Sequence, residues 1–283
     1  MLYVFLFIFG LLIGSFLNVI ALRYDGDRMV ADPKVIGGRS RCPHCGATLQ
    51  WYELIPVVSF IIQKRRCRNC KEKIGWQYPL VELLSACIFV FVPLQTFTLT
   101  GPGEAFIVFS VLWTIVFELL LLVAYIDIRL GIIPDELNVA LGILGIFMAI
   151  FLGGYYGLAN HSLFGLYAAW FGLQQNIWMN HVAAAVLAAA FFALLILVTR
   201  GKGMGMGDVK LAIPLGLIFG WPDVMFVIVS AFIIGAIAGV ALILRGTKTM
   251  KGSLPFAPFL IAGAAVVFFA GLRLAGGYFG ILM

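Results

Sequence analysis

Apolar runs follow one another along this chain from its first residues almost to its last. A helix needs about 20 apolar residues to cross the ~30 Å of hydrocarbon in a bilayer. Runs of about this kind lie at Leu2–Leu22, Leu80–Leu99, Ala105–Ile126, Leu137–Leu152, His181–Val198, Val209–Phe219, Val224–Leu244 and Phe256–Ala275. Only 11% of the residues are charged, against about 25% in soluble domains. The sequence therefore predicts an all-α polytopic membrane protein with about eight transmembrane helices.

Two of these runs, Leu137–Leu152 and Val209–Phe219, are shorter than the others. We expect them to extend into flanking residues, to tilt, or to be partly buried in protein.

Lysine and arginine are concentrated in every second connection between the runs. If the N-terminus is outside, the connections 23–79, 127–136, 199–208 and 245–255 are cytoplasmic, and they hold seventeen of the nineteen basic residues. Cytoplasmic loops are enriched in Lys and Arg, so this orientation is predicted. The net charge of +6 is then explained by topology and by attraction to anionic lipid head groups. The expected partner is a lipid bilayer, and no nucleic-acid partner is expected.

The chain is predicted to have three parts: a first transmembrane helix at 1–22, a cytoplasmic cysteine-bearing loop at 23–79, and a membrane-embedded core at 80–283. Segment 1–22 lacks a basic leading region and a small-residue cleavage site, so we interpret it as a retained span. The uncharged aromatic stretch 153–180 is interpreted as an external loop with an interfacial or re-entrant helix, because Trp and Tyr favour the head-group level. A ninth span there would break the charge pattern.

The loop contains two Cys-x-x-Cys pairs, Cys42 with Cys45 and Cys67 with Cys70, separated by twenty-one residues. This spacing is typical of a tetrahedral four-thiolate Zn²⁺ site. Two disulfides are the alternative, but the predicted cytoplasmic location is reducing. Zinc, or another thiolate-bound metal, is therefore the favoured interpretation. Cys87 lies within a span and is interpreted as a small buried hydrophobic residue.

Two carboxylates mark the cytoplasmic ends of apolar runs. Asp127 closes the third run, and Asp208 follows the glycine-rich turn Gly203-Met-Gly-Met-Gly207. A carboxylate close to hydrocarbon costs roughly 2.5 kcal/mol or more at a helix centre, so it is a functional hypothesis by default. Two carboxyls near one water, one protonated and one ionised, can perform aspartyl proteolysis. Each Asp alone could also be a helix cap or a surface charge.

Other acids and polar residues in the runs have simpler interpretations. Asp135 is expected to cap the fourth span, with Glu136 as a favourable acid in its first turn. Glu118, near the middle of the third span, is expected to contact a polar partner within the bundle. The basic cluster that starts at Lys64-Arg65-Arg66 is interpreted as a solvated or lipid-facing surface.

Several ordered motifs together resemble the type IV prepilin peptidase family, also called prepilin leader peptidase/N-methyltransferase, which belongs to the G-x-G-D aspartyl proteases. These motifs are Gly14-Ser-Phe-Leu-Asn18-Val19, both cysteine pairs, Trp51-Tyr-Glu-Leu-Ile-Pro56, Tyr78-Pro-Leu-Val-Glu82, Ile126-Asp127 to Pro134-Asp135, Gly203 to Lys210, and Pro255-Phe-Ala-Pro-Phe259. The resemblance covers nearly the whole chain.

The resemblance implies an enzyme of the bacterial inner membrane that cuts the basic leader of prepilins or pseudopilins after a glycine, on the cytoplasmic side. Asp127 and Asp208 match the catalytic pair of the family. The resemblance also implies N-methylation of the new N-terminal residue, often Phe, with S-adenosylmethionine as the donor, since the four-cysteine loop is typical of bifunctional members. Asn18 and Ser15 either line the methyl-transfer site or bond neighbouring helices.

The chain departs from the usual family pattern at two places. Asp127 and Asp208 are 81 positions apart, a wide separation whose excess falls in 153–180. Arg129 stands where many members have an acid. Neither departure changes the expected reaction.

Three alternatives stay open at this point. A transporter or channel would predict several acids at span centres and repeat symmetry, but only Glu118 is so placed and no repeat is found. A non-catalytic scaffold would keep its activity when Asp127 or Asp208 is replaced by Asn. A peptidase without methylation is the third.

Overall fold

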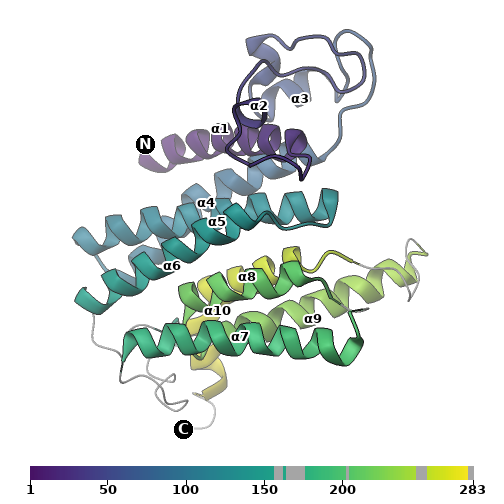
Figure 1. Ribbon diagram of the computed structural model, residues 1–283. Helices are drawn as coiled ribbons and strands as arrows, with labels where there is room; N and C mark the ends of the chain where they lie inside the picture. The colour runs from purple at the N-terminus through teal and green to yellow at the C-terminus, as the bar shows by residue number, and fades with distance from the viewer. Residues whose placement is uncertain (156–161, 164–175, 202–203, 247–253, 280–283) are drawn as a thin grey trace. The chain divides into compact units, whose positions relative to one another are not determined.

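The computed structural model of the chain is all-helical and describes residues 1–155, 162–163, 176–201, 204–246 and 254–279 (Figure 1). The chain divides into two compact units, Met1–Leu122 and Val123–Met283. The boundary between them falls within helix α5. The described helices are α1 (Leu2–Arg23), α2 (Pro33–Ile36), η1 (Trp51–Leu54), α3 (Val58–Ile62), α4 (Gln77–Thr100), α5 (Glu104–Leu130), α6 (Asp135–Tyr155), α7 (Ile177–Thr199), α8 (Met206–Phe219), α9 (Asp223–Leu244) and α10 (Ala257–Phe279).

Every apolar run predicted from the sequence coincides with one of these helices. Within the described residues, five of them, α1, α4, α5, α7 and α9, are long and apolar enough to cross a membrane, and the part of α10 at Ala257–Gly271 is a shorter apolar helix. The multi-pass prediction is confirmed at this level, and the count of eight stays a prediction. Helix α8 has 14 residues, or about 21 Å at 1.5 Å per residue, so it is too short to span the hydrocarbon alone.

In the first unit, α1 packs along α4 at a very short distance. A Cβ at Gly14 would lie 2.7 Å from the Cα of Glu82, so only glycine allows the two backbones to approach this closely. The Nδ2 of Asn18 donates to the carbonyl oxygen of Tyr78 at 3.1 Å. This bond supports the interpretation that Asn18 bonds neighbouring helices.

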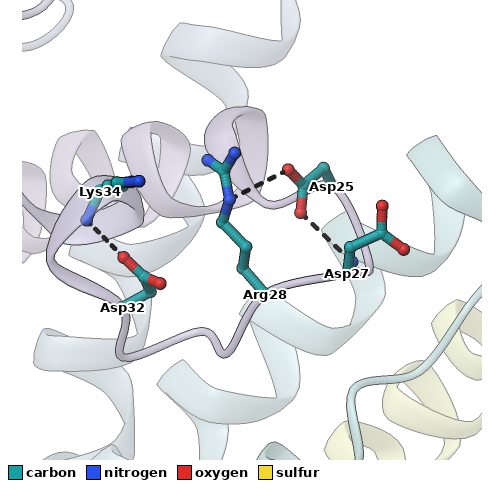
Figure 2. A network of polar contacts seen from close by, with 5 residues as sticks. All are labelled: Asp25, Asp27, Arg28, Asp32 and Lys34. Carbon is teal, nitrogen blue, oxygen red and sulfur yellow. Dashed lines mark hydrogen bonds and ion pairs between the residues drawn. The ribbon is translucent and has the colours of Figure 1, made fainter.

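The loop after α1 begins with an acidic segment that is held by short-range polar contacts between residues close in sequence (Figure 2). The carboxylate of Asp25 pairs with Nε of Arg28 at 3.7 Å and accepts from the backbone N–H of Asp27 at 3.2 Å. Asp32 caps α2 by accepting from the N–H of Lys34 at 2.7 Å. Short-range turns and caps of this kind order the loop where it leaves the membrane span.

In the second unit, α8 packs against both α6 and α7. Eight of its fourteen residues are buried, including Asp208. A Cβ at Gly216 would lie 2.4 Å from the Cα of Ala185 on α7, and Gly145 of α6 faces Leu217 in the same close manner. A short helix that cannot span by itself is thus packed against neighbouring helices, which agrees with partial burial, one of the three expectations for Val209–Phe219.

A polar turn joins α7, α8 and α9. The side chain of Asn180 accepts from the backbone N–H of Trp221 and donates to its carbonyl oxygen, both at 2.8 Å. Most of the stretch 153–180, for which an interfacial or re-entrant helix was predicted, lies outside the described residues.

Candidate functional site

Each cysteine pair sits on a tight turn of nearly the same backbone geometry. The N–H of Cys42 donates to the carbonyl of Ala47 at 2.9 Å, and the N–H of Cys67 donates to that of Glu72 at 2.8 Å. Isolated antiparallel bridges close both turns, Arg41 with Thr48 and Arg66 with Lys73. The residue after the second cysteine is left-handed in each turn, Gly46 at φ 70° and Lys71 at φ 62°.

The two turns bring all four cysteines together. The Sγ atoms of Cys42, Cys45, Cys67 and Cys70 lie within 4.8 Å of one another, and those of Cys42 and Cys70 are 3.9 Å apart. Zn–S bonds of about 2.3 Å in a tetrahedron place the sulfurs about 3.8 Å apart. The cluster is therefore a candidate metal site, as the spacing predicted, and its geometry fits zinc.

The surroundings of these thiols shift their pKa values in opposite directions. The backbone N–H of Ala47 and the side chain of Asn69 lower the pKa of Cys45 to about 6, and the N–H groups of Cys70 and Asn69 also lower the pKa of Cys67. For Cys70, the N–H of Glu72 lowers the pKa, but burial and the three neighbouring thiols outweigh it and raise the pKa to about 11. Four thiolates at this spacing repel one another, and a bound cation removes that repulsion.

Asp127 lies in the last turn of α5 and is 5% exposed. Its Oδ2 accepts a hydrogen bond from the backbone N–H of Ala257 at 3.2 Å. Ala257 is the first residue of α10 and is fully buried. The free N–H groups at a helix start stabilise a carboxylate there and fix its orientation.

Asp208 lies in the first turn of α8 and is 8% exposed. Its backbone N–H bonds the carbonyl of Gly205 at 3.2 Å. Asp127 lies within electrostatic range of the carboxyl of Asp208. The structure therefore brings the two predicted carboxylates together in a buried place within the second unit.

Two further contacts join the segments that carry these acids. A Cβ at Gly207 would lie 3.3 Å from Cδ1 of Ile133, so the glycine turn packs against the connection that follows Asp127. The Nζ of Lys210 forms an ion pair with both carboxylate oxygens of Asp135, at 2.7 and 2.9 Å. Asp135 was expected to cap α6, but this helix begins at Asp135, and the side chain of Asp135 is engaged by Lys210.

Both acids were predicted from the sequence. The hydrogen bond from Ala257 and the ion pair of Lys210 with Asp135 were not predicted. Ala257 acts through its backbone N–H, which every residue except proline carries, so no residue type signals it. The flanking Pro255 and Pro258 are the signal that a helix begins there.

The intramembrane Glu118 has the polar partner that was expected, since Ser85 Oγ lies 3.0 Å from its Oε1. The same hydroxyl lies 2.7 Å from the carbonyl oxygen of Gly10, and its single O–H donates to one of the two acceptors at a time. Among the described side chains, the Oε2 of Glu118 and the Oδ1 of Asn18 are buried acceptors with no hydrogen-bond partner. Both belong to the first unit, and Glu118 lies nine positions before Asp127 on the same helix, α5.

The fold and the two clusters define a class: a multi-pass membrane protein with a buried pair of carboxylates and a four-cysteine cluster in a polar loop. Comparison with known families agrees with this class. Residues 8–96 match the family model described as Bacterial Peptidase A24 N-terminal domain, and residues 114–240 match that of the Type IV leader peptidase family.

Curated relatives are similar over nearly the whole chain. A "Prepilin leader peptidase/N-methyltransferase" of Burkholderia pseudomallei is 32% identical, covering 94% of this chain and 85% of its own. Proteins of the same name from Bacillus subtilis (31%, covering 94% and 93%) and Pseudomonas aeruginosa (32%, covering 90% and 86%) are also similar. No solved structure matches the chain significantly. The chain belongs to the type IV leader peptidase family, peptidase family A24.

Proposed function

We propose that this protein cleaves the basic leader of type IV prepilins or pseudopilins after a glycine, at the cytoplasmic face of the bacterial inner membrane. Asp127 and Asp208 would form the catalytic dyad. The observation that carries this proposal is the burial of both carboxyls, within electrostatic range of each other, in the part of the chain matched by the Type IV leader peptidase family.

The chemistry follows from two carboxyls that share one proton. The ionised carboxylate takes a proton from water as the water oxygen bonds to the scissile carbonyl carbon, and the protonated partner donates to the carbonyl oxygen. Collapse of the tetrahedral intermediate then releases the amine, which receives a proton from the dyad. The bond from Ala257 to Asp127 supports this mechanism, since it holds one carboxylate in a fixed orientation.

The membrane position of the dyad suits the substrate class. Asp127 ends a candidate span and Asp208 begins a buried helix, so the pair would lie near one face of the bilayer. A prepilin has a basic leader followed by an apolar helix, which can lie among the spans while the leader stays in the cytoplasm. Asp135 is already paired with Lys210, which argues against a main role in attracting the leader.

We also propose that the protein N-methylates the new N-terminal residue with S-adenosylmethionine, in line with the names of its relatives. That donor supplies the methyl group from a cationic sulfonium as the C–S bond breaks, and the acceptor amine must give up a proton as its nitrogen bonds to the methyl carbon. The unpartnered buried Oε2 of Glu118 belongs to a carboxyl group that could accept this proton, and the unpartnered buried Oδ1 of Asn18 is a neutral amide oxygen that could accept a hydrogen bond. They are the residues that would face the donor or the amine.

The four cysteines would hold one Zn²⁺ as a structural ion. Four protein ligands fill a tetrahedral site and leave no position open for a substrate. The ion would therefore stabilise the loop between α1 and α4 and take no part in peptide cleavage.

The test is cleavage of a prepilin with a Gly-Phe junction by purified wild type, Asp127→Asn and Asp208→Asn in detergent, followed by mass spectrometry of the mature N-terminus. We expect wild type to cut and both variants to lose at least 10³-fold in rate, because each lacks one carboxyl of the dyad. With S-adenosylmethionine present, the wild-type product should gain the mass of one methyl group.

Other outcomes separate the alternatives. If either variant cuts at the wild-type rate, that Asp is not catalytic and the dyad assignment fails. If wild type cuts but adds no methyl group, the protein is a peptidase alone. If wild type cuts no prepilin while its zinc content and helical content are normal, the scaffold interpretation replaces the enzyme.

A further inference from the structure

A stripe of apolar side chains lies exposed on the polar loop between the two cysteine pairs. It consists of Trp51, Leu54, Ile55, Val58, Ile61 and Ile62, which are between 39% and 76% exposed. They lie in and between the two separate short helices η1 and α3. Six exposed apolar residues gathered within twelve positions of a polar loop indicate an interaction site. We call it the outer stripe.

The outer stripe is fixed to the first turns of the span α4. The ring of Phe60, within α3, lies 5.2 Å from that of Trp76, which directly precedes α4. The backbone N–H of Val57 donates to Oε2 of Glu82 at 2.8 Å. Glu82 is only five residues into α4, or about 8 Å along the helix axis. The stripe must therefore lie close to the level where α4 enters the bilayer.

Positive charge follows the stripe directly. Residues 51–76 contain six basic residues, Lys64, Arg65, Arg66, Arg68, Lys71 and Lys73, against the two acids Glu53 and Glu72. Two of the basic groups stack on aromatic rings of the same segment, Arg65 over Trp76 at 5.2 Å and Arg68 over Tyr52 at 5.4 Å. The charge pattern of the whole chain puts this loop in the cytoplasm, where the leaflet surface is anionic.

We propose that the segment Trp51–Ile62 is a monotopic membrane anchor. The outer stripe enters the boundary between head groups and acyl chains of the cytoplasmic leaflet, while Lys64 and its basic neighbours bind anionic head groups. A Trp and several branched aliphatic residues beside a basic cluster are the composition of elements that lie in this interface. Insertion removes these apolar side chains from water, which is favourable. Within the loop itself they stay exposed.

One consequence concerns the four-cysteine cluster. Both cysteine pairs flank the anchor in sequence, so the anchor would hold the cluster flat against the membrane surface. The proposal does not rest on the enzymatic activity of the chain, and its test requires none.

The test uses the full-length protein in bilayers that carry brominated lipids, which quench tryptophan on contact. The emission of Trp51 is taken as the difference between wild type and Trp51→Phe, because the chain has six tryptophans. In bilayers with one quarter anionic phosphatidylglycerol, we expect lipid brominated near the head group to quench this emission at least twofold more than lipid brominated near the bilayer centre. Aqueous acrylamide should quench it weakly.

A charge arm tests the head-group contact. The triple variant Lys64→Gln, Arg66→Gln, Lys73→Gln avoids the two stacked arginines, and we expect it to reduce shallow quenching of Trp51 at least twofold. In bilayers of zwitterionic lipid alone, the shallow quenching of Trp51 in the wild type should be reduced at least twofold as well. The matched control is Lys34→Gln, Arg39→Gln, Arg41→Gln, which removes three exposed charges from the same loop and should leave the quenching unchanged.

Two results would overturn the proposal. Strong acrylamide quenching with no lipid quenching would mean that the stripe stays in water. Protection of Trp51 from both quenchers would mean that protein covers the stripe, either another part of this chain or a second copy. The zinc content of each variant shows whether its loop is folded, so a misfolded variant cannot imitate either result.

Discussion

At the scale of single residues, the hydrogen bond from Ala257 to Asp127 is the contact with the clearest functional consequence. It is a backbone bond, so only proline removes the donor. Ala257 is the first residue of α10, a position where proline fits a helix. We expect Ala257→Pro to lower kcat/KM for prepilin cleavage at least tenfold, since a hydrogen bond to a charged group contributes about 1.5 kcal/mol or more.

Ala257→Gly keeps the N–H and serves as the control for this change. It should stay within about threefold of wild type. Because Ala257 is fully buried, the thermal unfolding of both variants must be measured alongside activity. A folded Ala257→Pro protein with wild-type activity would show that the bond does not orient Asp127 for catalysis.

A second prediction concerns the metal. Purified wild type should contain about one zinc per chain by elemental analysis, and Cys42→Ser or Cys67→Ser should contain almost none, because a tetrahedral site loses a quarter of its ligands. Cys87, which lies in α4 outside the cluster, provides the control, and Cys87→Ser should keep the zinc. Zinc retained in Cys42→Ser would place the metal elsewhere.

Much of the site at this scale could be predicted from the sequence. The cysteine pairs are short-range patterns whose spacing already implies one metal, and their four sulfurs do lie within 4.8 Å of one another. The two aspartates could be selected because charge is rare in the apolar runs. The partners Ala257 and Lys210 could not, because their roles depend on contacts between helices far apart in the chain. Which helices pack together decides these contacts, and the type of residue at each position does not reveal it.

At the scale of helices, close packing around α8 positions Asp208. We expect Gly216→Ala to destabilise the protein by about 1–3 kcal/mol, because the new methyl group would lie 2.4 Å from the Cα of Ala185 and must displace a backbone. In thermal unfolding this corresponds to a decrease of roughly 2–10 °C. Peptidase activity should fall as well, since α8 carries the aspartate.

Gly142→Ala is the matched control on α6, because a Cβ there would meet nothing within 4 Å. It should be neutral or slightly stabilising, since alanine favours the helix over glycine. Equal destabilisation by both substitutions would mean that loss of glycine itself, and not the approach of α7 to α8, explains the result.

Helix positions were largely predictable, but their ends and surroundings were not. Apolar length located each helix, because hydrocarbon demands it. The sequence did not show that α8 would be enclosed by α6 and α7, although its fourteen residues made enclosure necessary. Nor did it show that the loop between the cysteine pairs would present its apolar residues outward. In a loop, the side that faces solvent depends on how the turns close, and composition alone does not determine this.

At the scale of the whole molecule, the two compact units agree with two separate family models. The N-terminal model ends at residue 96, within the first unit, and most of the peptidase model lies in the second. Both catalytic candidates belong to the second unit, and the cysteine cluster belongs to the first. The division of the chain at 22 and 79 that was expected from the sequence stays a prediction.

The orientation of the chain in the membrane is the last prediction, and it decides whether the aspartate pair can meet a cytoplasmic leader. With the N-terminus outside, α4 ends outside at Thr100, just before Gly101, and α5 ends in the cytoplasm at Leu130, just before Gly131. Alkaline phosphatase, which is active only outside, should therefore be active when fused after Gly101 and inactive after Gly131. A green fluorescent protein that folds only in the cytoplasm should give the opposite result. If both reporters behaved in reverse, Asp127 would face outward, and neither the positive-inside argument nor cytoplasmic cleavage could stand.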